Sequence, residues 1–264
     1  MRSDWTALPE AVTTGIADRI GGTDAVPASS GDHAEIAATV TGTNGTVFVK
    51  AANTELGVRS LRYELRASRA VTLPYPPAVE WDFETDGWLV VGFEHCAGPH
   101  ADLSPDSAHL ELLGETLEEL GETPAPDQTW FSPTARLGFT HPATEGATLV
   151  HSDLNPANLI VTPAGLRIVD WAYATRAAAW VELALLVPWL VGSGHTPEQA
   201  ERWLAQFPAW SATNPAILDE FASRNASKWS RKAQQSTARW IHDLAARNTR
   251  WTVYRHMKAP QRPS

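Results

Sequence analysis

The sequence predicts an α+β protein of two lobes: a small N-terminal lobe with an antiparallel sheet and one helix, and a larger, mainly helical C-terminal lobe. Apolar and small polar residues alternate over residues 34–52, which is the pattern of half-buried strands. Residues 216–259 contain neither proline nor glycine, which permits long helices. Residues 94–104 are typical of a connector, so we expect the lobes to comprise residues 1–94 and 95–264.

A hairpin in the N-terminal lobe is indicated by the dipeptide Asn44-Gly45. Both central positions of a two-residue hairpin turn require positive φ, which Asn and Gly adopt readily. The returning strand, residues 46–51, then carries Phe48 and Lys50 on the same face, because side chains alternate along a strand. Lys50 is therefore expected near the end of a strand.

Helices are expected on both sides of the connector. Apolar residues recur at helical spacing in residues 56–71, with Glu64 among them. A second helix is expected over residues 104–122, where Ser104 is in the N-cap position and Pro105 in the first helical position.

Three tryptophans in the last third, Trp229, Trp240 and Trp251, recur every eleven residues, which is about three helical turns. One long helix would carry all three on one face. Core packing is the favoured interpretation of this spacing, ahead of an aromatic platform for a ligand.

The charge and cysteine content argue against some classes of protein. Lys and Arg number 21 and Asp and Glu number 30, so the formal net charge is -9. Non-specific nucleic-acid binding requires a basic surface, so we expect no nucleic-acid partner. A single cysteine, Cys96, excludes an internal disulfide framework, which is typical of proteins in a reducing cytoplasm.

The most membrane-like stretch is residues 177–192, which is short for a membrane span and contains Glu182 and Pro188. We expect a buried core helix there and no membrane partner. The start of the chain has no apolar run, so no secretory signal is expected and the predicted location is the cytoplasm.

Two strand-like runs in the second half of the chain, residues 158–161 and 166–169, are joined by a predicted four-residue turn. In that register Asn158 faces Val169, so Asp170 lies one step past Asn158 on the neighbouring strand. An amide oxygen and a carboxylate held side by side are suitable ligands for a hard cation such as Mg²⁺.

Asp153 precedes this hairpin and lies on a predicted loop. A carboxylate in that position is able to accept, or to orient, the proton of an attacking hydroxyl group. Turn formation is the competing interpretation for each small polar residue taken alone. A metal-and-base site is favoured for the ordered set of His151, Asp153, Asn155, Asn158 and Asp170.

His151, Asp153, Asn158 and Asp170 match the pattern H-x-D-x-x-x-x-N followed by a strand and an Asp. This segment resembles the catalytic segment of the aminoglycoside phosphotransferase and choline-kinase-like family, whose members are relatives of the protein kinases. The resemblance covers about residues 20–190 and implies a protein-kinase-like fold. It implies that Asp153 is the catalytic base or orients the hydroxyl, that His151 supports the catalytic loop, and that Asn158 and Asp170 hold Mg²⁺.

The resemblance extends to the N-terminal lobe. It implies that Lys50 binds the phosphates of the nucleotide and that Glu64 forms an ion pair with Lys50. Phe48 is a candidate for stacking on adenine, with core packing as the equal alternative. In the segment "ASSGDHAE", Ser30 and Gly31 are candidates to cradle phosphate through backbone N–H groups and a hydroxyl.

The sequence departs from the family pattern at several positions. The phosphate loop is not rich in glycine, since it offers only Gly31. Ser152 stands where glycine is usual, and Asn155 stands where histidine is frequent. Glu182 replaces the aspartate usual at the start of a buried helix, which affects how the catalytic loop is braced.

The resemblance implies an enzyme that moves the γ-phosphate of ATP or GTP, with Mg²⁺, to a hydroxyl of a small molecule. Aminoglycosides, other antibiotics, choline, homoserine and sugars are all acceptors of relatives, and the sequence does not choose among them. A cationic acceptor is one candidate because of the net charge. Candidate ligands for an amine are the acidic residues Glu182, Glu198, Glu201, Asp219 and Glu220.

Two other classes of protein are open to test. A kinase-like fold that binds nucleotide without chemistry is compatible with the unusual phosphate loop, although it fits poorly with the presence of all the catalytic residues. A protein kinase is disfavoured, because no "APE"-like element follows Asp170 and little room remains for an activation segment before Ala177.

Overall fold

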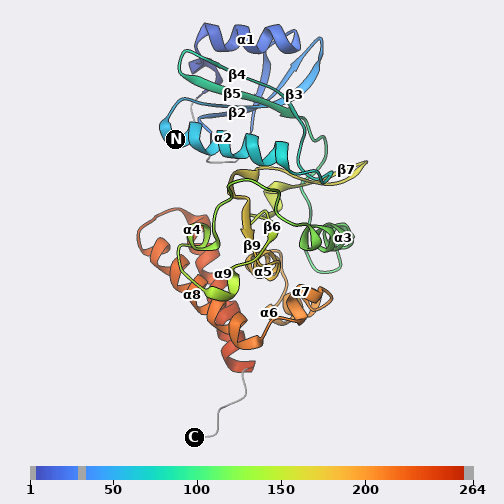
Figure 1. The fold of residues 1–264 in the computed structure, drawn as a ribbon, viewed down its shortest axis with the longest axis vertical. Coiled ribbons are helices and arrows are strands. Elements are labelled where there is room, and N and C mark those ends of the chain that lie inside the picture. Colours follow the sequence, from blue (N-terminus) through green and yellow to red (C-terminus); the bar gives the residue numbers. More distant parts are fainter. Residues whose placement is uncertain (1–3, 29–33, 259–264) are drawn as a thin grey trace, which may run out of the picture. The chain divides into compact units, whose positions relative to one another are not determined.

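The computed structural model describes residues 4–28 and 34–258 (Figure 1). By its internal contacts the chain forms two compact units. Unit 1 comprises Met1–His100 and Ala157–Ala172, and unit 2 comprises Ala101–Pro156 and Tyr173–Ser264. The predicted catalytic segment is therefore divided between the units. Its Asp153 end belongs to unit 2, and the hairpin that follows belongs to unit 1.

Unit 1 is built on a five-stranded antiparallel sheet with the strand order β1-β2-β3-β5-β4. Helix α1 covers one face and helix α2 covers the other (Figure 1). Only one helix was expected in this part, so α1 is an addition to the predicted lobe. The elements of unit 1 are α1 (Glu10–Ile20), β1 (Asp24–Pro27), β2 (Ile36–Gly42), β3 (Gly45–Ala52), α2 (Glu55–Ala70), β4 (Val79–Thr85), β5 (Trp88–Glu94), β7 (Leu159–Thr162) and β8 (Gly165–Ile168).

The two faces of strand β3 serve different purposes. Val47, Val49 and Ala51 are buried in the core that also contains α1. Phe48 and Lys50 alternate with them and so point to the side of the sheet that α2 covers. There Phe48 packs on a second cluster of buried residues, which α2 and β5 form with the end of β3. The expectation that Phe48 and Lys50 share a face near the end of a strand is confirmed.

The hairpin between β2 and β3 is present, but its turn is one residue away from the predicted one. Gly42 pairs with Gly45, so Thr43 and Asn44 are the central turn residues. The reason lies in tertiary packing, because the turn sits on the end of α1. The Asn44 N–H donates to the Ile20 carbonyl at 2.9 Å, and a Cβ on Gly42 would lie 2.1 Å from that same oxygen.

The hairpin of β7 and β8 has the register that the sequence predicts. Val161 pairs with Leu166, and the Val169 N–H donates to the Asn158 carbonyl at 2.9 Å. Asp170 follows directly, so Asn158 and Asp170 are both at the open end of the hairpin.

Unit 2 is mainly helical, and α8 and α9 pack together as a helical hairpin (Figure 1). The stretch considered for a membrane forms α5, a core helix, and within the described residues no helix has the length and apolarity to cross a membrane. The elements of unit 2 are α3 (His109–Glu122), α4 (Pro133–Leu137), β6 (Thr148–Val150), β9 (Thr175–Ala177), α5 (Trp180–Gly192), α6 (Pro197–Leu204), α7 (Pro208–Ser211), α8 (Pro215–Gln234) and α9 (Arg239–Lys258).

Two helical expectations for unit 2 are wrong in detail. Helix α3 begins at His109 and not after Ser104, because Asp106 adopts a left-handed conformation with φ 66° and interrupts any earlier start. Long helices are present as α8 and α9, but the single helix that would carry all three tryptophans on one face is not, because the chain breaks between α8 and α9. Trp251 is buried in the core. Trp229 and Trp240 lie on either side of the break and contact each other edge to face, with their ring centres 6.1 Å apart.

Candidate active site

Lys50 is held between two carboxylates in unit 1. Its Nζ donates to both oxygens of Glu64, at 2.7 and 2.8 Å, and to Asp170 Oδ1 at 2.9 Å. Strand β3 carries the lysine, α2 carries Glu64, and Asp170 follows β8. The expected ion pair of Lys50 and Glu64 is present, and it joins residues of the sheet, a helix and a hairpin that are distant in sequence.

Burial and charge determine the protonation of this group. Burial disfavours the charged form of Lys50, but the carboxylates of Asp170 and Glu64 outweigh it and raise the pKa of Lys50 above its ordinary value. Burial raises the pKa of Glu64, with a further contribution from Asp170, while Lys50 acts in the opposite direction. Lys50 is therefore cationic at neutral pH, and two carboxylates share it.

The open end of the β7–β8 hairpin suits a magnesium ion. The Asn158 side chain is buried, and the side chain of Asp170 is 16% exposed. Asp170 has φ 65°, a left-handed conformation that costs about 1 kcal/mol or more in a non-glycine residue and is common at functional sites. An amide oxygen and a carboxylate are the oxygen ligands that Mg²⁺ prefers, and the two carboxylates on Lys50 leave a negative charge for a cation to offset.

The structure gives no evidence of nucleotide contact for three of the predicted nucleotide-binding residues. Phe48 is partly buried and packs against the core formed by α2 and β5, so core packing is observed at this position. Ser30 and Gly31 lie outside the described residues.

Asp153 is held in unit 2 by its neighbours on the loop of residues 151–155, which is the predicted catalytic loop. Its N–H donates to His151 Nδ1 at 3.3 Å, and Asn155 Nδ2 donates to Asp153 Oδ2 at 3.3 Å. Arg136 Nη2 lies 3.5 Å from Asp153 Oδ1. His151 is fully buried and accepts a hydrogen bond from the loop backbone, and the carboxylate of Asp153 is oriented by an amide and a guanidinium.

Glu182 braces the catalytic loop from the first turn of α5. Its carboxylate accepts hydrogen bonds from the N–H groups of His151 and Ser152, with the Ser152 bonds at 3.0 and 3.1 Å. Burial raises the pKa of Glu182 to about 7, although both N–H groups act in the opposite direction. The longer side chain thus reaches the loop backbone directly, so Glu182 is a support of the loop.

Ser152 occupies a strained backbone position. Its φ of 63° is left-handed, which explains why glycine suits this position. The hydroxyl of Ser152 accepts from Arg136 Nε at 2.9 Å and donates to the Tyr173 carbonyl at 2.7 Å. Arg136 also donates to the Ser152 carbonyl at 2.7 Å and stacks on the Tyr173 ring at 4.2 Å. The two hydrogen bonds of the Ser152 hydroxyl offset the backbone strain of its left-handed conformation, which a glycine at this position would not have.

Arg136 was not among the residues predicted from sequence. The only local signal is the Ser132-Pro133 start of α4, where the Ser132 hydroxyl accepts from the Ala135 N–H at 3.2 Å. That signal predicts a helix but not the direction of an arginine three residues later. Only the folded chain brings Arg136 to Asp153.

The acidic residues considered as ligands for an amine have partners within unit 2. Glu182 holds the catalytic loop, and the others form ion pairs: Glu198 with Arg202, Glu201 and Asp219 with Arg255, and Glu220 with Arg224. Each carboxylate thus already has a cationic or N–H partner.

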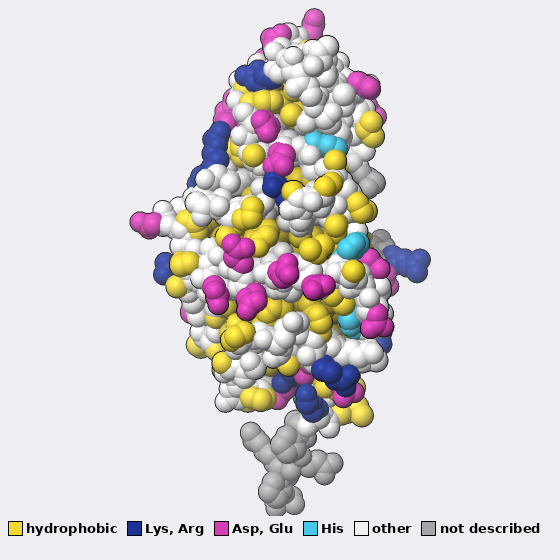
Figure 2. Space-filling view, turned by 90° about the vertical axis from the view of Figure 1, so that its right-hand side faces the viewer, with side chains coloured by type: hydrophobic (Ala, Val, Ile, Leu, Met, Phe, Trp, Pro, Cys, Tyr) yellow, Lys and Arg dark blue, Asp and Glu magenta, His cyan; other side chains and the backbone are white. Residues whose placement is uncertain are grey.

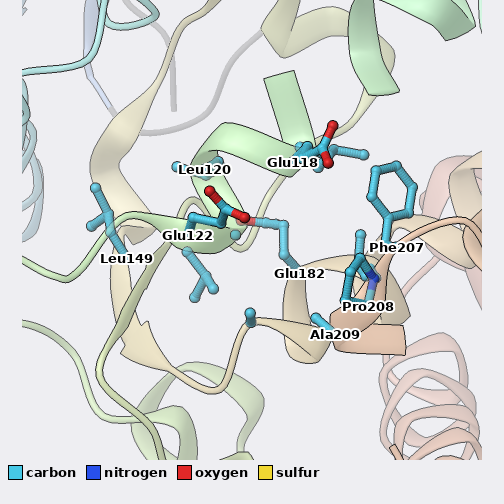
Figure 3. Close-up of a pocket in the computed structure, with 13 residues that line it drawn as sticks. Glu118, Leu120, Glu122, Leu149, Glu182, Phe207, Pro208 and Ala209 are labelled. Atoms are coloured by element: carbon cyan, nitrogen blue, oxygen red, sulfur yellow. The ribbon is translucent and has the colours of Figure 1, made fainter. Parts of the chain in front are cut away.

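A cavity of about 170 Å³ lies in unit 2 between α3, β6, α5 and α7. Figure 3 shows Glu182 at its wall, with Glu118 and Glu122 from α3 and Phe207, the residue before α7, around it. Most of the lining is apolar, and Asp153 is not part of it. We therefore assign the cavity no part in the chemistry.

The sheet, the lysine–glutamate pair and the catalytic loop define a protein-kinase-like fold. A sequence profile of the family described as the phosphotransferase enzyme family (APH) matches residues 140–216, so the resemblance seen in the catalytic segment is confirmed for that part of the chain. A search of curated protein sequences finds no match.

Solved structures support the same fold over nearly the whole chain. A thermostable mutant of aminoglycoside phosphotransferase APH(4)-Ia, in a ternary complex with AMP-PNP and hygromycin B, has a TM-score of 0.65 at 14% identity and covers 96% of this chain and 100% of its own. The choline kinase LicA from Streptococcus pneumoniae has a TM-score of 0.62 at 15% identity, and the match covers 93% of this chain and 98% of LicA. At such low identity these likenesses establish the fold.

Proposed function

We propose that the protein is a small-molecule kinase that transfers the γ-phosphate of ATP, or of GTP, to a hydroxyl group. The observation that carries the proposal is the bonding of Lys50 Nζ to both Glu64 and Asp170, the latter 120 residues away. A buried lysine with that pair of partners has the arrangement that binds nucleotide phosphates in kinases. The structural neighbours include complexes with ADP and with AMP-PNP, which favours an adenine nucleotide.

Residues of unit 1 would bind the nucleotide. Lys50 would contact the α- and β-phosphates, with Glu64 keeping its ammonium group in place. Asn158 and Asp170 would hold Mg²⁺, which neutralises charge on the phosphates during transfer. We assign Phe48 to the adenine side and Ser30 and Gly31 to the phosphate loop.

Residues of unit 2 would prepare the acceptor. Asp153 would orient the acceptor hydroxyl and receive its proton as the new bond to phosphorus forms. Asn155 and Arg136 fix the direction of that carboxylate, and Glu182 holds the loop that carries it. Catalysis of this kind depends mainly on positioning and on charge.

The acceptor is a hydroxylated small molecule in this proposal. The neighbours in fold include a complex with hygromycin B and a choline kinase, so antibiotics and small metabolites are the two groups to test first. The net charge of -9 is the argument for a cationic acceptor. The acidic side chains of unit 2 that were considered as ligands for an amine already have partners, so they do not support a cationic acceptor.

Two measurements test the function. Thermal shift with Mg-ATP and with Mg-GTP should stabilise the wild type, and the shift should be lost in Lys50→Ala but kept in Arg62→Ala, a control at an exposed ion pair of unit 1. An ATP-consumption assay over a panel of hydroxylated antibiotics and metabolites should then reveal turnover that Asp153→Ala lacks. Nucleotide binding without turnover across the panel would instead favour a kinase-like binding protein.

A further inference from the structure

Helices α4 and α8 of unit 2 carry cationic side chains that interact through their charges, and Arg224 of α8 donates to the Thr140 carbonyl, just past α4, at 3.2 Å. Arg136 on α4 has its Nη2 3.5 Å from Asp153 Oδ1. Lys228 and Lys232 lie one helical turn apart on α8, so they share a face of that helix. We refer to Arg136, Lys228 and Lys232 as the basic cluster.

Both lysines of the basic cluster lie near the ring of Trp229, with their ammonium groups 5.6 Å and 4.7 Å from its centre. Like charges four residues apart on a helix repel each other. Within the part of the chain that the structure describes, neither ammonium group has a carboxylate at ion-pairing distance. The repulsion between them is therefore not offset by a bonded acidic residue.

Charge interactions connect Lys228 with the residues at the catalytic loop. Its pKa is lowered to about 7, first by burial and then by the positive charges of Arg136 and Lys232, while the charge of Asp153 acts in the opposite direction. The pKa of Lys232 is lowered as well, by burial and by Arg136. Three cationic groups thus act on one another, and an additional anion would stabilise them.

This local charge is opposite to the charge of the whole chain. Acidic side chains gather on the face of unit 2 that Figure 2 shows, on the side where α3 lies. The exposed acidic residues of α3 are Glu111, Glu115, Glu118, Glu119 and Glu122. The excess of acidic residues is thus carried in part by α3, and the surroundings of Asp153 are basic.

We infer that the acceptor hydroxyl belongs to an anionic molecule, whose carboxylate or phosphate group binds the basic cluster beside Asp153. The inference rests on the proposed function, because it assumes that the acceptor is bound at Asp153. An amine in the same place would face like charges, which disfavours it against an anion of similar shape. The ligand class is therefore a hydroxy acid or a phosphorylated alcohol.

The test compares molecules that share a skeleton and differ in charge. Glucosamine, glucose, gluconate and glucose 6-phosphate form one set, and glycerol, glycerate and glycerol 3-phosphate form another. Calorimetry in the presence of Mg-AMP-PNP measures the binding of each, and the ATP-consumption assay measures KM where turnover occurs. The variants are Lys228→Gln and Lys232→Gln, with Arg239→Gln as a control that removes one positive charge from a side chain 94% exposed on α9.

The expected result is that anionic members bind more tightly than their neutral and cationic counterparts. Lys228→Gln should weaken the binding of the anionic members about tenfold, and Arg239→Gln should leave it unchanged. The inference is overturned if the anionic members bind no better than glucose or glycerol, or if their binding is the same in the Lys228→Gln variant. Failure of the proposed function is a separate result, namely a wild type that Mg-ATP does not stabilise.

Discussion

Units 1 and 2 surround their candidate catalytic carboxylates with opposite charge. In unit 1, Glu64 and Asp170 share the single ammonium group of Lys50, so negative charge is in excess. In unit 2, Asp153 lies beside Arg136, on which the charges of Lys228 and Lys232 also act, so positive charge is in excess. The first arrangement suits Mg²⁺ and the second suits an anion. The net charge of a chain is therefore a poor guide to its ligands when individual sites differ in sign.

Replacing Asp153 tests the catalytic role of unit 2 and should have the largest effect. Asp153→Ala removes the group that receives the proton, so kcat should fall by about a hundredfold or more. The thermal shift with Mg-ATP should persist, because the nucleotide-binding side chains are in unit 1. Near-full turnover in a coupled assay would show that Asp153 does not have this role.

Replacing Lys50 tests the charge balance of unit 1. Lys50→Ala leaves Glu64 and Asp170 without their shared cation, and breaking a buried pair in this way costs on the order of 3 kcal/mol in the free energy of unfolding. Urea denaturation measures this loss. The control Arg62→Ala removes an exposed partner of Glu84 and should change the free energy by less than about 1 kcal/mol. Equal effects of the two variants would contradict the description of Lys50.

Replacing Glu182 tests the support of the catalytic loop. Glu182→Gln removes one of the two acceptor oxygens from the N–H groups of His151 and Ser152, so about 1–3 kcal/mol of stability should be lost. The activity should fall further than the stability loss alone explains, because the loop carries Asp153.

The pH dependence of this variant has a definite sign. Burial raises the pKa of Glu182 from 4.5 to about 7, so its contribution to stability is complete below pH 4.5 and is lost as the pH rises through 7. Glutamine does not titrate. The stability difference between wild type and Glu182→Gln should therefore narrow from pH 5 to pH 8 in urea denaturation. A difference that is constant with pH would rule out the raised pKa.

The charge of Lys228 tests the anion site of unit 2 through pH. Burial, Arg136 and Lys232 lower its pKa to about 7, with Asp153 opposing, so Lys228 loses its proton as the pH rises above neutrality. The dissociation constant of an anionic acceptor should increase by up to about tenfold from pH 6 to pH 8. Lys228→Arg keeps a cation at both pH values and should remove this increase. Persistence of the increase in the arginine variant would assign it to another group.

Changes at Ser152 should have the smallest effect. Ser152→Gly relieves the left-handed strain but loses the bonds with Arg136 and the Tyr173 carbonyl, so stability should change by less than about 1 kcal/mol. Ser152→Ala keeps the strain and loses the same bonds, so it should be the less stable of the two. The reverse order in urea denaturation would mean that the backbone at this position is not strained.

Local patterns in the sequence were sufficient for part of the structure. The β7–β8 hairpin has the predicted register, and Phe48 and Lys50 share a face of β3 as predicted. Both features depend on residues within a few positions of one another. The start of α3 at His109 was not predicted, because the left-handed conformation of Asp106 overrides the apparent cap at Ser104.

The residues of the candidate site divide in the same way. Asp153, Asn158 and Asp170 are close in sequence and form a recognisable pattern, and Lys50 and Glu64 follow from the same resemblance. Arg136, Lys228 and Lys232 belong to no pattern in the chain. Their role depends on the packing of α4 and α8 near the loop.

The amino-acid sequence alone was enough for the two-lobed α+β class and for the hairpin that carries Asn158 and Asp170, while the pairing of Lys50 with Glu64 was implied by the family resemblance. Alternation, turn preference and motif spacing act over short distances along the chain, so they can be read without coordinates. The shifted turn at Thr43 and the position of Arg136 beside Asp153 required the folded chain. These features arise from contacts between distant segments, and electrostatic interactions depend on distance in space rather than on separation in sequence.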